Sequence, residues 1–489
     1  MHIYKNLFII FFGLIIFSAR GQVNVNSDSL LVGKHPDPLL IIPENRLHAA
    51  ALIFTTNMGV WSFDHFIAQA PYASIDFNTI KSNIKTGFVW DNDMFVTNLF
   101  AHPYHGGLYF NAARSNGLNF WQSAPFTTGG SLMWEFCMEN ESPSINDVLA
   151  TSFGGICLGE MNFRISDMII DDRTMGFNRF KREALLMIVS PIRGLNRLIR
   201  GDAWKLRRTK GNSIPTVPTT FYSTIGHRII ADDLKKKEEI SNMLCIDLGL
   251  YYGNPYDPDN EKPYDFFQLK LGGNLFSEQP LISRASALGM LYCRSIALRK
   301  SNHQLALGFF QHFNYYESKT EINNASLSSY KISEAASVGP GILHKIKFKN
   351  HMTFSSSAYL SAILLGGSQT DHYKFDERDY NMGSGFSSKL NLDLQFGNNI
   401  RIFLNSEDYR IYSWLGDDPN NPDNTSTSVQ GDKGNASLSV ANLGFSFTIS
   451  GHFLLEAETG YYYRRSIYSY YPDVEHSVTE NKVSVGYIF

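Results

Sequence analysis

The feature that most constrains this chain is the alternation of apolar and polar residues in its second half. In KLNLDLQF, residues 389–396, a leucine or phenylalanine occupies every second position. After the turn Gly397-Asn398-Asn399, isoleucine and leucine repeat this spacing over residues 400–404. Successive side chains of a β-strand point to opposite faces, so both segments have one apolar face. The pattern predicts a hairpin whose apolar face points toward lipid.

Segments of this kind recur from about Pro215 to the end of the chain, and we count about twelve strands there. An even number places both ends of a closed antiparallel sheet on one side. The two connections ADDLKKKEE and NPYDPDNEKP, within residues 222–263, are both long, and one of them must join strands on the side of the short turns. A change of apolar parity in residues 436–449 predicts a β-bulge at Ala441-Asn442.

The last strand, NKVSVGYIF, places Val483, Val485, Tyr487 and Phe489 on one face. It resembles the closing strand of bacterial outer-membrane β-barrels, which typically ends in phenylalanine. That resemblance implies outer-membrane lipid and, through the Phe489 strand, the barrel-assembly machinery as partners. The 25 Tyr and 36 Phe of the chain suit aromatic girdles at two membrane interfaces. We predict a transmembrane barrel over residues 206–489.

The beginning of the chain has the features of an export signal. Lys5 precedes an apolar run over residues 7–17, and small residues at Ala19 and Gly21 suit a signal peptidase. We predict a signal peptide over residues 1–21 and a flexible segment over residues 22–44. Since no later apolar run has the length of a membrane-spanning helix, the chain is expected to cross the membrane with strands. The expected location is the bacterial outer membrane.

Residues 45–205 follow helical rather than strand spacing, which predicts a helical module in front of the barrel and an α+β membrane protein. Helices are expected over residues 46–67, 105–121 and 129–140. Another is expected to begin with Ser142 as its cap and Pro143 in its first turn. In the last expected helix, over residues 177–201, Pro191 bends or ends the helix and Gly201 terminates it.

Four blocks of this module resemble those of an uncharacterised family of exported bacterial proteins, a domain of unknown function. They are DNDMFVTNLFAHPYHGGLYFNAARSNG, GGSLMWEF, SINDVLATSFGGICLGE and SPIRGLNRLIRG. The resemblance covers roughly residues 90–201. It implies an outer-membrane setting and no particular activity, so candidate site residues must come from the chemistry of the side chains.

The first candidate site lies in HPYHGGLYFNAARSNG. His102 and His105 flank a proline that is expected to prevent a regular helix through His102. His102, Asn111 and Arg114 form a candidate binding set. A metal site would need a third ligand such as Asp91 or Asp93, and no HExxH spacing is present. We predict neither a metal site nor a cofactor.

The second candidate set is catalytic and consists of His105, Glu135, Asp147 and Glu160, since partial burial in apolar helices would shift their proton affinities. An alternative is that these carboxylates pair with arginines of neighbouring helices, namely Arg114, Arg164, Arg193 and Arg197. Whether the protein is an enzyme stays open at this point.

Small residues and cysteines of the module have structural interpretations. Thr151, Gly155 and Gly159 recur every four residues, which predicts a groove for close helix packing. Ala112, Ala113, Ser115 and Asn116 are the expected facing surface. Ser115 and Ser123 lack the context of a catalytic nucleophile. Cys137 and Cys157 either form a disulfide or, like Cys245 and Cys293, act as small apolar residues.

The net charge of −3, without a basic stripe, excludes a nucleic-acid partner. The sequence therefore predicts an outer-membrane β-barrel whose helical module plugs the barrel or lies in the periplasm. Its role would be in envelope structure, assembly or transport. The alternative is an outer-membrane enzyme that acts on lipid, lipopolysaccharide or another envelope polymer through the helical module.

Overall fold

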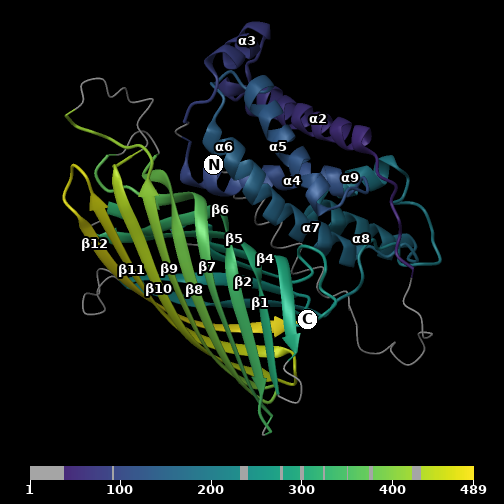
Figure 1. Cartoon of the computed structure of the whole chain (residues 1–489), viewed down its shortest axis with the longest axis vertical. Helices are drawn as coiled ribbons and strands as arrows, with labels where there is room; N and C mark the ends of the chain where they lie inside the picture. Colours follow the sequence, from purple (N-terminus) through teal and green to yellow (C-terminus); the bar gives the residue numbers. More distant parts are fainter. Residues whose placement is uncertain are drawn as a thin grey trace. The chain divides into compact units, whose positions relative to one another are not determined.

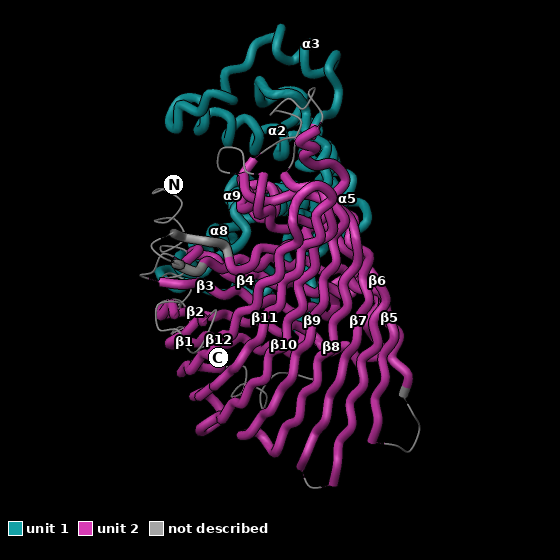
Figure 2. The backbone as a smooth tube through the Cα atoms, turned by 90° about the vertical axis from the view of Figure 1, so that its left-hand side faces the viewer, with its two compact units in different colours: residues 1–89, 103–216, 489 teal, residues 90–102, 217–488 magenta. Residues whose placement is uncertain are grey.

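A computed structural model describes residues 38–90, 93–231, 240–275, 279–297, 302–322, 325–349, 351–373, 378–420 and 431–489 (Figure 1). The predicted signal peptide, residues 22–37 and Asp91 lie outside these ranges. The chain forms two compact units (Figure 2). Residues up to 89 and 103–216 form the helical unit, and residues 90–102 join residues 217–488 in the barrel unit. The predicted domains, residues 45–205 and 206–489, stay a prediction.

The barrel unit is a closed antiparallel barrel in which β1 pairs with β12 as well as with β2. This confirms the predicted fold class and the count of twelve strands. The strands are β1 (Thr219–Ala231), β2 (Ile240–Tyr252), β3 (Phe267–Leu275), β4 (Ile282–Ala297), β5 (His303–Ile322), β6 (Ala325–Lys347), β7 (Met352–Gln369), β8 (Tyr380–Phe396), β9 (Ile400–Ser413), β10 (Gly434–Ile449), β11 (Phe453–Tyr468) and β12 (Val474–Ile488).

The barrel has a terminal end, where β1 begins and β12 ends, and an opposite end. The short turns 397–399 and 450–452 lie at the terminal end. The connection 253–266 lies there too, because β2 runs toward that end. It contains NPYDPDNEKP, which is therefore the long connection on the side of the short turns.

The outer wall is apolar where the sequence predicted it. Leu390 and Ile402 are 42% and 39% exposed, and Val483 and Val485 are 66% and 54% exposed. Between the last two lies Ser484, which is 3% exposed and faces the lumen. Alternation therefore separates an apolar outer face from an inner face throughout this hairpin and the closing strand.

The predicted bulge at Ala441-Asn442 is wrong. Strand β10 pairs with β9 and β11 in unbroken register through this stretch. The parity changes because Leu438 and Val440 face the lumen, where they belong to an apolar cluster. Register shifts occur elsewhere, for example at Gly272-Gly273 where β3 pairs with β4.

Residues 93–102 pack on the outer wall of their own unit. The Phe95 ring lies 5.0 Å from the Tyr315 ring and 5.2 Å from the Tyr380 ring, measured between centroids. Asn98 Nδ2 donates a hydrogen bond to the Tyr380 hydroxyl at 2.7 Å. Tyr315 lies between two residues of β5 that face the lumen, so its side chain points outward. This segment therefore lies outside the lumen.

The remaining elements are helical. They are α2 (Arg46–Phe63), the π-turn η1 (Asp64–Ala68), the 3₁₀ turn η2 (Pro71–Ala73), α3 (Phe77–Thr86), the π-turn η3 (Thr97–Ala101), α4 (His102–Arg114), α5 (Phe120–Cys137), α6 (Ile145–Leu149), the π-turn η4 (Ala150–Gly154), α7 (Gly155–Ile169), α8 (Gly176–Val189) and α9 (Pro191–Ile199). Among the described residues, none of these helices combines the length and the apolar character needed to cross a membrane.

Several predicted helix boundaries need correction. His102 is helical, because the π-turn η3 leads directly into α4. The wide turn also tolerates Pro103, which has no N–H to donate. The helix expected over residues 105–121 is two helices, since Gly117 adopts φ +82° and Asn119 caps α5. Ser144, rather than Ser142, caps α6 through the N–H of Asp147. Helix α8 ends at Val189, which confirms that the helix ends before Pro191, and Pro191 begins the separate helix α9.

Helices α4 and α7 cross at glycines. A Cβ on Gly106 would overlap the carbonyl oxygen of Thr151, and a Cβ on Gly155 would overlap the backbone of Gly106. The predicted groove is therefore present, but the prediction of the surface that faces it is wrong. The groove faces Gly106 and Gly107 and not the alanines further along α4, because two backbones approach most closely where neither residue has a side chain.

We expect Gly106→Ala to destabilise the helical unit by about 1–3 kcal/mol, because the new methyl group overlaps a backbone carbonyl that cannot move freely. Gly129→Ala is the matched control, since a Cβ there meets no atom within 4 Å. The control should stabilise α5 by about 0.5–1 kcal/mol. Loss of the 222 nm circular dichroism signal on heating measures both. Equal effects of the two substitutions would contradict this packing.

Candidate functional site

His105 takes part in a hydrogen-bonded row inside the helical unit. Its Nε2 lies 3.0 Å from the hydroxyl of Tyr109, one turn later on α4. That hydroxyl donates a hydrogen bond to the Asn57 side chain on α2. The His105 ring also meets the ring of Trp134 on α5 edge to face, with 5.2 Å between centroids. His105 is half-buried, whereas Tyr109 is fully buried.

Glu135 shares this neighbourhood. Its carboxylate is 1% exposed and accepts a hydrogen bond from the backbone N–H of Ser144 at 2.8 Å. Burial raises the pKa of the Tyr109 phenol well above its ordinary value, and the negative charge of Glu135 raises it further. Tyr109 is therefore a neutral donor at physiological pH. Of the predicted catalytic set, His105 contacts the Tyr109 hydroxyl, and the charge of Glu135 acts on it.

Glu160 has a different environment. It is fully buried and accepts hydrogen bonds from Arg114 Nε at 2.7 Å and from Arg164 Nε at 2.8 Å. Two guanidinium groups thus compensate one carboxylate, which is the pairing that the alternative interpretation required. Arg193 pairs with a different acid, Asp167 of α7, and contacts Ser166 in the same helix.

The other predicted site residues have contacts of their own. Asn111 Nδ2 donates to the carbonyl of Gly159 at 3.0 Å, and its Oδ1 accepts from Ser190, so it fastens α4 to its neighbours. Asp147 accepts from the Asn146 side chain at the start of α6. His102 is half-buried at the first position of α4.

The other sequence candidates have local partners. In the part of the chain that the structure describes, no three histidines, cysteines or acids are grouped as metal ligands are. The hydroxyl groups of Ser115 and Ser123 donate to backbone carbonyls of their own helices. Cys137, Cys157, Cys245 and Cys293 are free thiols, so the disulfide alternative is not realised.

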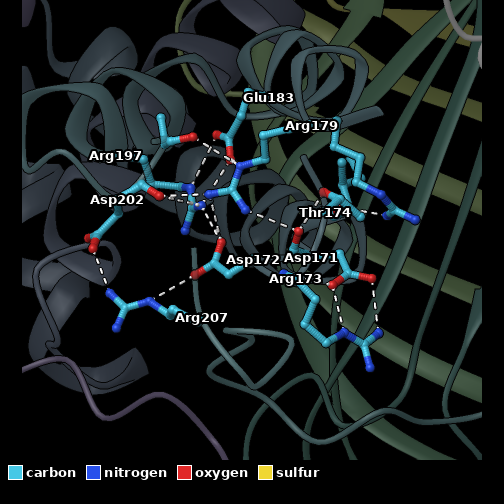
Figure 3. A network of polar contacts seen from close by, with 12 residues as sticks. Asp171, Asp172, Arg173, Thr174, Arg179, Glu183, Arg197, Asp202 and Arg207 are labelled. Atoms are coloured by element: carbon cyan, nitrogen blue, oxygen red, sulfur yellow. Dashed lines mark hydrogen bonds and ion pairs between the residues drawn. The ribbon is translucent and has the colours of Figure 1, made fainter. Parts of the chain in front are cut away.

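The densest polar network of the helical unit surrounds Asp172 and was not predicted from the sequence (Figure 3). Asp172 is fully buried and pairs with Arg197 at 2.8 Å, Arg179 at 2.9 Å and Arg207 at 3.0 Å. Glu183 adds a second carboxylate, 2.9 Å from Arg197. All these groups are paired, so the network fastens α8 and α9 to the residues that follow them.

A layer of apolar and aromatic side chains crosses the barrel lumen, and we call it the lumenal layer. Nine of the twelve strands contribute to it. Its members are Ile230, Met243, Tyr316, Tyr330, Ile332, Ile363, Tyr409, Ile411, Leu438, Val440, Tyr462 and Val478. All are at most 5% exposed, and the rings of Tyr330 and Tyr462 stack 4.5 Å apart.

Ion pairs between different strands fill the lumen on the terminal side of this layer. Arg228 of β1 pairs with Glu480 of β12 at 2.6 Å. Lys482 lies 2.9 Å from Glu458 and 3.1 Å from Asp247, and so connects three strands. The sequence shows such charges at lumen-facing positions, but not which of them pair. Interactions across the lumen are long-range in sequence, and alternation alone cannot assign them.

Two cavities remain among these lumenal charges. The first contains about 510 Å³ of empty space and is lined by Arg228, Glu480 and Lys482, among others. The second contains about 480 Å³ and is lined by residues of β3, β4, β5, β7, β8 and β9. Both volumes include space that is open to solvent.

Comparison with known proteins identifies one family model. Residues 87–192 match a family described as a domain of unknown function, DUF3943. This match covers much of the helical unit and none of the strands. No curated protein matches the chain.

Solved structures similar to this chain include porins and other outer-membrane proteins, at 7–11% identity. The NanC porin has a TM-score of 0.26 at 9% identity, over 54% of this chain and 98% of that one. The KdgM porin in complex with disordered oligogalacturonate has 0.25 at 11% identity, over 56% and 99%. OmpT, an outer membrane protein of Vibrio cholerae, has 0.23 at 7%, over 55% and 97%. These scores are low, and the barrel assignment rests on the strand pairing of this chain.

We expect Glu160→Gln to destabilise the helical unit by about 3–5 kcal/mol, because it removes the buried carboxylate charge that the guanidinium groups of Arg114 and Arg164 share. Glu44→Gln serves as the control, since Glu44 pairs with Arg46 at 3.9 Å on the surface. The control should change stability by less than about 0.5 kcal/mol. Thermal unfolding at 222 nm measures both. A Glu160→Gln protein as stable as the control would show that the pairing contributes little.

Proposed function

We propose that this protein is an outer-membrane anchor, in which a closed barrel holds the helical module in the envelope in a structural or assembly role. The observation that carries the proposal is the lumenal layer. A barrel of twelve strands has room for an aqueous path only if inward side chains leave the centre free. Here side chains of nine strands meet across it.

The ion pairs on the terminal side of the layer support the same conclusion. Charged groups that line an open aqueous path are normally hydrated, whereas Arg228 and Glu480 here bind each other and the Tyr330 hydroxyl. Each of these three side chains is at most 10% exposed. Ion movement through the lumen would have to break these contacts.

The helical module is proposed to lie outside the lumen, with the terminal end of the barrel in the periplasm. Two features support this. The lumen is filled by the strands' own side chains, and residues 93–102, which lead into α4, pack on the outward side of Tyr315. A plug would have needed an empty lumen.

A second candidate function is an enzyme that acts on lipid, lipopolysaccharide or another envelope polymer. The row from His105 through Tyr109 to Asn57 favours it, because a half-buried imidazole beside a neutral phenol suits proton transfer. Glu135 would then act through Tyr109. Asp147 and Glu160 are the remaining residues proposed for such a site, with His102, Asn111 and Arg114 in binding.

Because side chains fill the lumen, the purified wild-type protein should produce no steady conductance steps in planar lipid bilayers. Tyr330→Ala with Tyr462→Ala should create such steps, because it removes two stacked rings from the lumenal layer. The control is Tyr461→Ala, since Tyr461 is 50% exposed on the outer face of β11, the strand that contains Tyr462. Steady open-channel steps from the wild-type protein would exclude the anchor as proposed.

The enzyme alternative predicts a change in envelope lipids or polymers when His105 is replaced. Cells that carry His105→Gln should then have the same envelope composition as cells without the protein. Mass spectrometry of extracted lipids and lipopolysaccharide, with cells that carry Lys81→Gln as the control, measures this. Unchanged composition in cells that lack the protein would remove the enzyme candidate and leave the anchor.

A further inference from the structure

The second lumenal cavity has hydrogen-bond donors that no group among the described residues satisfies. It lies on the terminal side of the lumenal layer, as Asn405 and Glu407 precede Tyr409 along β9. Its charged lining residues are Lys270 of β3, Arg284 of β4, Lys389 of β8 and Glu407 of β9, together with His312 of β5.

His312 provides the most defined donor. Its side chain is 2% exposed, and its Nδ1 lies 3.2 Å from the ammonium group of Lys389. An ammonium group can only donate, so Nδ1 accepts and the proton of the neutral ring must be on Nε2. Nε2 has no hydrogen-bond partner. A buried N–H group of this kind costs about 1–3 kcal/mol unless something accepts from it.

Two cations of the cavity already have counter-charges. Lys389 pairs with Glu334, which is fully buried and also accepts from Ser387 at 2.7 Å. Arg284 lies 3.5 Å from Glu407 through one terminal nitrogen, and its Nε has no partner. Arg284 therefore offers a second free N–H group to the cavity that it lines.

Lys270 is the third cation of the cavity. Its side chain is half-buried in the cavity wall, and its charge also acts on the carboxylate of Glu458. Its ammonium group adds hydrogen-bond donors to the free N–H groups of His312 and Arg284. Several N–H donors directed into one cavity are what an oxyanion requires.

We propose that this cavity binds a small oxyanion, a carboxylate or a phosphate, whose oxygen atoms accept from His312 Nε2, Arg284 Nε and the Lys270 ammonium group. The site is separate from the helical module, and its occupancy does not depend on whether the barrel conducts ions. The lumenal layer closes the cavity from the opposite end, so the anion enters from the terminal end.

The test uses the full chain in detergent and the temperature at which the folded barrel converts to its slower-migrating, unfolded form on a gel. Sodium phosphate and sodium acetate are compared with sodium chloride at equal ionic strength. One or both oxyanions should raise this temperature by about 2–4 °C with saturation in the millimolar range. Comparison of the two salts distinguishes a phosphate from a carboxylate ligand.

Lys270→Met should abolish this increase, because it removes a donor and a positive charge from the cavity. His312→Phe should reduce the increase, and His312→Gln, whose amide can still donate, should retain part of it. Lys81→Gln, an exposed position on α3, should respond as wild type. An oxyanion effect of equal size in Lys270→Met, or no saturable effect in wild type, would overturn the proposal.

Discussion

The hydrogen-bond ladder between β1 and β12 joins the two ends of the sheet, and the rest of the barrel depends on it. In hydrocarbon, an unpaired backbone N–H or C=O group costs several kcal/mol, so a sheet in a membrane must have no free edge. The pairing from Tyr222 with Ile488 to Ala231 with Thr479 satisfies this requirement. Closure also divides every strand into an outward and an inward face, and the two faces solve different problems.

Side chains on the outward face need only be apolar. Val483, Val485 and Leu390 meet this requirement independently of one another. Inward, side chains of different strands must fit together. Buried charges are tolerable only when each has a partner, as Arg228 has in Glu480. The lumen therefore contains paired charges on the terminal side of the apolar lumenal layer. The free donors near Lys270 are an exception to this pairing, and they motivate the oxyanion site.

The helical unit follows the same separation between local and long-range information. The four-residue spacing of Gly155 and Gly159 predicted a groove, and a groove is present. The sequence did not identify Gly106 as its partner, because the crossing point of two helices depends on both surfaces at once. Candidate site residues behaved similarly. Their burial could be predicted from apolar surroundings, whereas the assignment of Glu160 to Arg114 and Arg164 required the fold.

The sequence by itself determined the periodicities: strand alternation, an even strand count, the apolar closing strand and the helix end at Pro191. These are local properties, since they follow from the geometry of one strand or one helix. The tertiary structure decided which charges meet in the lumen, that Leu438 and Val440 face inward without a bulge, and that the Tyr109 hydroxyl joins His105 and Asn57. Those outcomes depend on residues far apart in the chain, and only closure and packing bring such residues together.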